Sequence, residues 1–399
     1  MKNNPNKLSL NNTMLLLLGL LFVVIGQCLA ENLPTIVANK NLMPPLKRKK
    51  LSAAIREMNT SNIIAIICSI NNNQRQQLSE EFQKANSKNV VEAMKENVNT
   101  LLDDSFWKTM FALMKPSAVY DASYLRGALS SKLFPVLFEI LATRTNEQIA
   151  ELKDAYEEQS NKKQMPTTLE DDIKTGTNSG PFQRLLLALL NGTRDETETV
   201  DEELARNDAK KLYSLSQKEK TDTVNDFNPS ENDHEFNKVF AERNFKQLRL
   251  TFDFYKQIAQ FDIEKGIKKE FGDANKAGYL ALIKYLRNRP MYFADLLHHS
   301  VEAFPINDFD LIRLLVTRSE VDLAEIKRAY HLLHEKTLQQ AVKATTSRGA
   351  FRNALLALLD GNVEVPKVAQ KRQNSETAVD VDADEPANKR QKMSRNLTV

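Results

Sequence analysis

Three stretches of the chain place apolar side chains at positions i, i+3, i+4 and i+7 and are nearly apolar all round. They read FWKTMFALM, FQRLLLALLNG and FRNALLALLDG, at residues 106–114, 182–192 and 351–361. This spacing follows the period of an α-helix, and a helix that lacks a polar face must be buried. Each stretch therefore predicts a buried helix at the centre of its own folding unit.

A second pattern recurs with the same spacing. The segment ATRTNEQIAELKDAY at residues 142–156 returns 174 residues later as VTRSEVDLAEIKRAY at residues 316–330, with seven of fifteen positions identical. Residues 68–82 and 241–255 give two weaker matches. The markers of the four segments, separated by 74, 99 and 75 residues, are Ile70, Arg144, Arg243 and Arg318. These distances predict four repeats of about 74 residues, with roughly 25 extra residues ahead of the third marker.

Each repeat is long enough for about five helices and a core of its own. In the second repeat the pattern predicts helices at 118–129, 135–143, 146–159, 167–175 and 181–191. Gly and Pro are scarce, at 11 and 13 residues, and no long alternating Val/Ile/Thr run is present. The sequence therefore predicts an all-α protein built as a string of four small helical domains.

The repeats also define the segments outside them. A basic start, an apolar run at residues 14–25 and the small residue Ala30 are typical of a secretory signal peptide, with an uncleaved anchor as the alternative. A polar, aperiodic stretch at 214–234 predicts a mobile inserted loop. The predicted segments are 1–30 signal peptide, 31–45 unstructured leader, 46–115 repeat one, 116–195 repeat two, 201–289 repeat three, 290–361 repeat four and 363–399 disordered tail.

Charge and cysteine content narrow the class of protein only slightly. The formal net charge of +3 falls to about +1 when residues 1–30 are removed, and one cysteine, Cys68, then remains. This excludes an intrachain disulfide, and the apolar surroundings of Cys68 predict an inert core residue. The basic block at residues 47–50 is open to three readings: a processing site, a contact with anionic lipid, or the solvated first turn of a helix.

The tail contains two basic clusters separated by sixteen residues. This arrangement is similar to a bipartite nuclear-import signal, although the spacer is longer than usual. The candidate import residues are Lys371, Arg372, Lys389, Arg390 and Lys392.

The predicted repeat architecture of this chain resembles that of the annexins. The repeat has five helices and about 74 residues, and it is used four times with a longer joint between the second and third. The matching phrases are ALMKPSAVYDA at 112–122, RDE at 194–196, DAKKLY at 208–213, YFA at 292–294 and VTRSE at 316–320. The resemblance covers residues 46–361. It implies a slightly curved all-α disc that holds calcium between its convex face and acidic phospholipid head groups.

In that family a Gly-x-Gly-Thr loop between the first two helices supplies carbonyl oxygens, and an Asp or Glu about forty residues later supplies two more. Here the loops read REMNT at 56–60, SSKLFP at 130–135 and EAFPIND at 302–308, while repeat three has the polar insertion. Glu96 offers an acid in an altered loop, and Glu270 is the only retained acidic match. We therefore expect calcium from the resemblance alone, with its binding weakened or lost.

The altered loops suggest a direct contact with an acidic phospholipid surface. Apolar tips can insert between head groups, and lysine adds attraction to anionic lipid. The candidate membrane-contact residues are Lys132, Leu133, Phe134, Phe304 and Ile306. The alternative is that the Phe and Ile side chains cap neighbouring helices inside the protein.

A second hypothesis is a secreted factor that binds proteins. A signal peptide combined with a nuclear-import tail is similar to the annexin-like effectors that parasitic nematodes secrete. In that case the helical scaffold binds a host protein, in the host cytoplasm or nucleus.

The sequence gives no support to an enzyme. His331 and His334 lie one helical turn apart without a third metal ligand, which favours a solvated face, and no nucleotide or nucleophile motif is present. We expect Trp107 in the core rather than in lipid. The marker arginines are expected to pair with acids between helices. Nothing indicates nucleic acid, and a monomer is expected.

Overall fold

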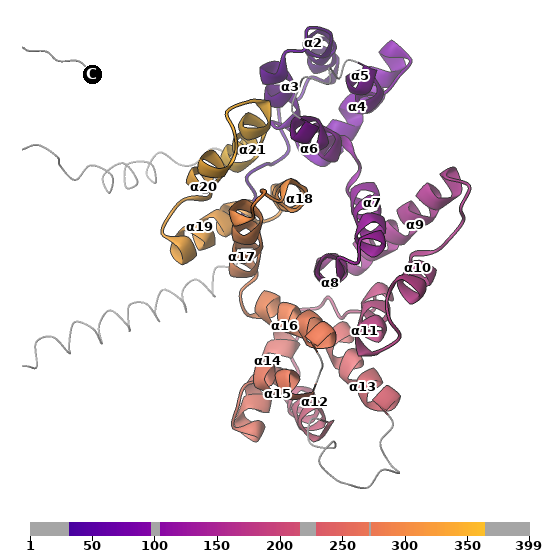
Figure 1. Ribbon diagram of the computed structural model, residues 1–399, viewed down its shortest axis with the longest axis vertical. Coiled ribbons are helices and arrows are strands. Elements are labelled where there is room, and N and C mark those ends of the chain that lie inside the picture. Colours follow the sequence, from indigo (N-terminus) through magenta and orange to yellow (C-terminus); the bar gives the residue numbers. More distant parts are fainter. Residues whose placement is uncertain (1–31, 97–103, 216–228, 271–272, 364–399) are drawn as a thin grey trace, which may run out of the picture. The chain divides into compact units, whose positions relative to one another are not determined.

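The computed structural model describes residues 32–96, 104–215, 229–270 and 273–363, and every regular element in these ranges is an α-helix (Figure 1). The helices fall into four groups of five, which confirms the predicted all-α fold class. The described residues up to Asn362 form one compact unit, so the repeats pack together and are not separate small domains. None of the described helices has both the length and the apolar character needed to span a bilayer.

The first two repeats contain ten helices. In repeat one they are α2 (Pro44–Arg56), α3 (Thr60–Ile67), α4 (Asn72–Asn86), α5 (Val90–Glu96) and α6 (Asp104–Met114). In repeat two they are α7 (Ser117–Ser130), α8 (Phe134–Thr143), α9 (Asn146–Lys162), α10 (Leu169–Gly176) and α11 (Pro181–Leu190). The five helices predicted for repeat two are thus confirmed, to within three residues at each end.

The last two repeats also contain five helices each. In repeat three the helices are α12 (Glu202–Leu215), α13 (Pro229–Glu242), α14 (Phe245–Ala259), α15 (Ile263–Glu270) and α16 (Asp273–Arg287). In repeat four they are α17 (Arg289–Glu302), α18 (Asp308–Arg318), α19 (Leu323–His334), α20 (Leu338–Thr345) and α21 (Ala350–Asp360).

The inserted loop is shorter than the sequence predicts. Helix α12 continues to Leu215 and α13 begins at Pro229, so both ends of the expected loop 214–234 are helical and residues 216–228 lie outside the described part. The sequence PSENDHE at 229–235 has no apolar period, although proline and acidic residues suit the first turn of a helix. A search for apolar periodicity therefore misses it.

Local side-chain contacts begin the third helix of each of the first three repeats. Asn71, Thr145 and Asn244 accept hydrogen bonds from backbone amides at the third helical position, and Thr145 forms a full capping box with Gln148. These caps satisfy amides that the first turn leaves unpaired. The repeated sequence pattern thus marks the point where the third helix begins.

The marker arginines differ between repeats. Arg144 donates two hydrogen bonds to Asp121 of α7, at 2.6 and 3.0 Å, and Arg243 contacts Asp208 of α12 in the same way, at 2.7 and 3.2 Å. These ion pairs between helices are as predicted. Arg318 instead pairs with Asp322, one helical turn further along the chain.

The repeats pack in two pairs. Helix α21 contacts α3 and α6, and α18 contacts α6, which joins repeat four to repeat one. Helix α16 contacts α8 and α11, and α13 contacts α11, which joins repeat three to repeat two. Buried Arg75 of repeat one supports the first pair through a 2.9 Å ion pair with Glu320 of repeat four.

The leader is not free, in contrast to the expectation of an unstructured segment. It has no helix before Pro44, yet the Thr35 and Ile36 amides both donate to the Ser319 carbonyl, at 2.8 and 2.9 Å. The Thr35 hydroxyl donates to the Leu358 carbonyl at 2.7 Å, and Ile36 is buried. The leader therefore fastens the start of repeat one to the end of repeat four.

Two predicted core residues lie in repeat one. Trp107 is buried in α6 and packs against Phe106 and Phe111. Cys68 is buried at the end of α3, and burial raises the pKa of its thiol to about 12. The core positions of both residues agree with the sequence prediction, and the raised pKa leaves Cys68 protonated and unreactive at neutral pH.

Candidate functional site

The loops that would hold calcium in repeats one and two are tight three-residue turns. Met58 and Lys132 occupy the left-handed region, with φ of 53° and 55°. In both turns the following amide returns to the first helix: Asn59 donates to Ala54 at 2.9 Å and Leu133 to Ala128 at 2.8 Å. This is the geometry of a helix C-cap, in which loop amides satisfy the last carbonyls of the helix.

The loop of repeat four is longer, and it also forms hydrogen bonds with the ends of the two helices that it joins. The Asn307 amide donates to the Ser300 carbonyl at 3.1 Å, and the Asn307 side chain accepts from the Asp310 amide, which starts α18. Between these anchors Phe304 is fully exposed, at 102%. The loop therefore presents an aromatic ring at its tip.

The position of the partner acid is neutral in repeats two and four. A side chain at Gly176 would lie 3.3 Å from Leu129, so the end of α10 does lie beside the end of α7. Nearby, however, the Thr177 hydroxyl is buried and donates to the Ile173 carbonyl at 2.7 Å. In repeat four the Thr346 hydroxyl donates in the same way to Val342. These hydroxyl groups satisfy their own helices and supply no negative charge.

Three of the acids in these repeats already have partners. Glu96 pairs with Lys88 at 2.5 Å, Glu302 with Lys336 at 2.5 Å, and Asp310 with Arg313 at 3.1 Å. Calcium requires six to eight oxygens, several of them anionic and free to turn toward the ion. Among the described residues no group of three acidic, histidine or cysteine side chains is arranged to hold a metal. The loops of repeats one, two and four therefore do not fit calcium.

The third repeat is described only in part. Glu270, the retained acidic match, is the last residue of α15, but its side chain lies outside the described residues. The same holds for the connection at 216–228. The signal-peptide segment 1–30 also lies outside the described part of the chain. The same is true of the predicted import residues of the tail, which are Lys371, Arg372, Lys389, Arg390 and Lys392.

The candidate membrane-contact residues separate into two groups. Lys132 and Phe304 are exposed, and Leu133 is 49% exposed. Phe134 is half-buried and its ring packs 5.7 Å from that of Phe182, while Ile306 packs against the core. The side chains of Lys132, Leu133 and Phe304 are thus exposed to solvent, whereas those of Phe134 and Ile306 are partly covered.

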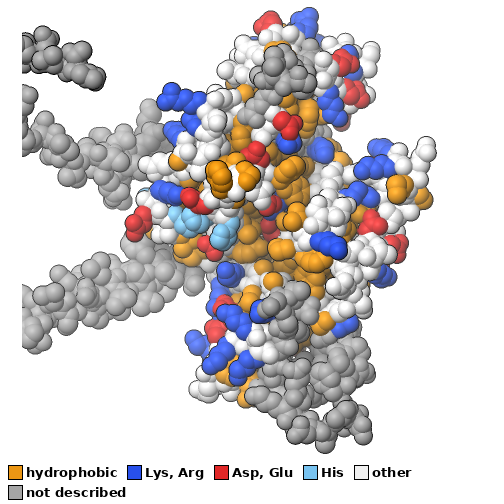
Figure 2. All heavy atoms as spheres, in the orientation of Figure 1, with side chains coloured by type: hydrophobic (Ala, Val, Ile, Leu, Met, Phe, Trp, Pro, Cys, Tyr) orange, Lys and Arg blue, Asp and Glu red, His pale blue; other side chains and the backbone are white. Residues whose placement is uncertain are grey.

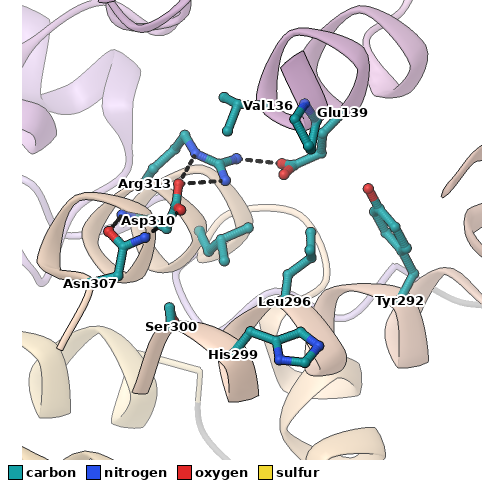
Figure 3. A pocket seen from close by; sticks show the side chains of 11 residues that line it. Val136, Glu139, Tyr292, Leu296, His299, Ser300, Asn307, Asp310 and Arg313 are labelled. Atoms are coloured by element: carbon teal, nitrogen blue, oxygen red, sulfur yellow. Dashed lines mark hydrogen bonds and ion pairs between the residues drawn. The ribbon is translucent and has the colours of Figure 1, made fainter. Parts of the chain in front are cut away.

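A charged cluster that sequence reasoning missed lies between repeats two and four. A cavity of about 150 Å³ is lined by side chains of α8, α17 and α18 (Figure 3). Inside it Arg313 donates to Glu139 and to Asp310, and the Arg313 and Glu139 side chains are 3% and 5% exposed. The sequence feature that could have revealed this cluster is a charged residue within an apolar run: Glu139 in FPVLFEILA and Arg313 in LIRLLV.

The described histidines gather over α17 and α19 (Figure 2). The rings of His298 and His334 stack with centroids 3.8 Å apart and an angle of 14°. Nε2 of His334 is buried and has no hydrogen-bond partner among the described residues. His331 is exposed as expected, but the prediction of a solvated face is wrong for His334, because α17 packs against this side of α19.

Comparison with known proteins identifies the family. The annexin family model matches residues 120–189 and 292–358. Annexin A13 of Canis lupus familiaris is 37% identical over 316 residues, which cover 78% of this chain and 93% of that protein. Annexin A4 of Homo sapiens is 34% identical over 303 residues, or 75% of this chain and 88% of that protein.

Solved structures give the same result. Annexin III superposes with a TM-score of 0.73 at 32% identity, covering 82% of this chain and 97% of that chain. Calcium-bound annexin (Sm)1 superposes with a TM-score of 0.73 at 25% identity, covering 84% and 95%. The family resemblance thus supports calcium as the metal of this fold, and annexins are in general non-enzymatic. The chain therefore belongs to the annexin family, whose general activity is calcium-dependent binding to acidic phospholipid membranes.

Proposed function

We propose that this annexin binds membranes as a peripheral protein through exposed apolar loop tips, with its calcium dependence weakened or lost. The observation that carries the proposal is the full exposure of Phe304 in the loop between α17 and α18. Removing a Phe side chain from water is worth about 1.5–3 kcal/mol. Insertion between lipid head groups would recover this free energy, and Leu133 would add a second apolar contact.

Calcium plays a smaller part in this proposal than in the family as a whole. In three of the four loops the glycines of the family pattern are replaced, and Glu96 and Glu302 are held in ion pairs. Lys132, exposed beside Leu133, supplies positive charge where the family would use the metal. Electrostatic attraction to anionic head groups then replaces a calcium bridge.

Co-sedimentation with liposomes tests the membrane contact. The protein is incubated with vesicles of phosphatidylserine and phosphatidylcholine, with calcium or with a chelator. We expect similar pelleting under both conditions and no calcium-binding heat in titration calorimetry of the protein alone. Pelleting that requires calcium would contradict the weakened dependence, and no pelleting under either condition would contradict membrane binding.

Tryptophan substitution tests the loop itself. Phe304→Trp places a fluorophore at the tip, and lipids brominated on their acyl chains quench only tryptophans that reach the bilayer. We expect strong quenching in this variant. Met165→Trp, at another position that is 72% exposed, is the matched control and should not be quenched. Equal quenching of both variants, or of neither, would rule out insertion of the Phe304 loop.

We also propose that the protein is a non-enzymatic monomer. Glu302 is held in an ion pair with Lys336 and His298 in a ring contact with His334, which supports a binding role rather than catalysis. Sedimentation velocity at several protein concentrations tests the monomer. A species of twice the mass at micromolar concentration would contradict it.

We further propose that the protein is secreted, and the N-terminal pattern of residues 1–30 supports this. Expression of the full chain in a secreting cell, followed by N-terminal sequencing of the product in the medium, is the test. A product found only inside the cell would refute secretion.

The alternative function is that of a secreted effector whose scaffold binds a protein in a host cell. It is supported by the combination of a signal-peptide pattern with the basic clusters of the tail. A fluorescent fusion of residues 31–399 should accumulate in the nucleus, and its Lys389→Gln/Arg390→Gln/Lys392→Gln variant should not. The same distribution for both would remove the nuclear part of this reading.

A further inference from the structure

The first repeat has a charge imbalance that the loop contact does not use. Residues 32–79 contain one acid, Glu57, and seven basic residues. The basic residues are Lys40, Lys47, Arg48, Lys49, Lys50, Arg56 and Arg75. Most of them lie on or next to α2, which packs on α3 and α4 at one end of the described unit (Figure 1).

Most of this charge is not compensated. Arg75 pairs with Glu320, and the Lys47 ammonium group donates to the Ser69 hydroxyl at 3.2 Å. Within the described residues Arg48, Lys49 and Lys50 have no ion pair. Exposed lysines elsewhere do form ion pairs one turn along their own helices: Lys84 with Glu81, Lys162 with Glu158 and Lys174 with Glu170.

The position of these charges is unfavourable for the helix. They occupy the first two turns of α2, which has no acidic residue in its first turn, while the amino end of a helix dipole is positive. The corresponding helices of other repeats avoid this arrangement. Helix α12 begins with Glu202 and Glu203, and in α17 the first residue, Arg289, pairs with Asp322 at 2.9 Å.

Apolar side chains lie beside the free cations. Met43 is 62% exposed and Leu46 is 47% exposed. The spacing from Met43 to Leu46 to Lys50 is i, i+3, i+7, so these residues lie along one side of the helix, next to Lys49. Apolar and basic residues side by side on an exposed helix are typical of a surface that rests in the head-group layer of a membrane.

We propose that this α2 face, formed by Met43, Leu46, Lys49 and Lys50, binds the head groups of an anionic phospholipid membrane without calcium. The membrane supplies the negative charge that the helix lacks and covers its apolar residues. Helix α2 has 13 residues. Lys50 and Lys49 lie about 9 and 10 Å along the helix axis from the loop that follows Arg56, and they form a contact separate from the loop tips.

This inference adds a preference for anionic lipids to the proposed membrane binding. It depends on residues of α2 and not on those of the loop tips. The test variant is Lys49→Gln/Lys50→Gln. The matched control is Lys162→Gln/Lys174→Gln, which removes the same charge from exposed lysines that have local partners. The vesicle-binding affinity of both variants is compared with that of the unaltered full chain in the presence of a chelator. The vesicles are pure phosphatidylcholine or equimolar phosphatidylserine and phosphatidylcholine.

We expect the α2 variant to lose affinity for the anionic vesicles by about twenty-five-fold, since each basic residue near such a surface is worth about fivefold. The control should change by less than about threefold. The affinity of the unaltered chain should fall steeply with added salt, and that of the α2 variant much less. Thermal unfolding should show the α2 variant to be at least as stable, because like charges have been removed.

The outcomes separate this inference from the loop contact. If the α2 variant and the control bind anionic vesicles equally well, the α2 face is not a lipid site. The same holds if the α2 variant binds soluble polyglutamate less well but anionic vesicles normally, because the partner is then an acidic protein. A Leu133→Ser/Phe304→Ser variant that keeps the salt-sensitive binding to anionic vesicles would support the α2 face, even if loop insertion proves wrong.

Discussion

Arg313 of α18 donates a hydrogen bond to Glu139 of α8, and this buried ion pair connects repeat four to repeat two (Figure 3). Burial opposes the charge on Arg313, but Glu139 and Asp310 outweigh it and raise the pKa of the guanidinium. The charge therefore persists inside the protein and depends on its two acids. Neither repeat can keep these side chains buried without the other.

We predict that Glu139→Ala lowers the free energy of unfolding by about 3 kcal/mol, because it leaves Arg313 buried with only Asp310 as a charged partner. The measurement is urea denaturation followed by circular dichroism. Glu158→Ala, which breaks the exposed pair with Lys162, is the control and should cost less than about 1 kcal/mol. Similar losses for the two variants would mean that the buried pair does not hold the repeats together.

A second prediction concerns acid stability. Burial and then the nearby charge of His298 lower the pKa of His334 below its usual 6.5. The unfolded chain therefore binds this proton more readily than the folded chain. The contribution of His334 to stability is present above about pH 6.5 and is lost as the pH falls through its lower folded value. Asp295, Glu302 and Lys336 also act on this imidazole.

His334→Gln should therefore reduce the drop in melting temperature between about pH 7.5 and pH 5.5. His331→Gln is the matched control, since His331 is exposed on the same helix. Its drop should equal that of the unaltered protein. Identical pH profiles for all three proteins would show that the stacked pair is not linked to folding.

A third prediction concerns the leader. Gly361 has φ of +64°, and a Cβ atom there would lie 1.9 Å from the Thr35 carbonyl oxygen. Gly361→Ala should therefore release the leader and cost about 2 kcal/mol of stability. Hydrogen exchange at residues 35 and 36 should rise. Gly349→Ala is the control, because Gly349 has extended backbone and no atom within 4 Å of an added Cβ. An intact, protected leader in Gly361→Ala would contradict this account.

The single tryptophan provides a fourth prediction. Trp107 is 2% exposed, so its fluorescence should be almost insensitive to acrylamide and unchanged by brominated lipid. Its emission should shift to the red only when repeat one unfolds. Quenching by brominated lipid in the unaltered chain would mean that repeat one opens at the membrane.

Much of the local structure could be predicted from the sequence. Apolar periodicity located the five helices of repeat two, and the recurring pattern marked the capped start of the third helices at Asn71, Thr145 and Asn244. It failed at Pro229, where a polar helix start resembles a loop. The loss of loop glycines was also readable, although Met58 and Lys132 keep the left-handed turn that glycine would have favoured.

The sequence by itself determined the four five-helix repeats and the replacement of the Gly-x-Gly pattern in their loops, because helix period, caps and loop residues act within a few positions of one another. Only the tertiary structure decided which repeats pair, how Glu139 meets Arg313, and that Phe134 is covered whereas Phe304 is exposed. These outcomes depend on contacts between residues far apart in the chain, 174 positions for Glu139 and Arg313 and 245 for Arg75 and Glu320. No local pattern encodes such contacts.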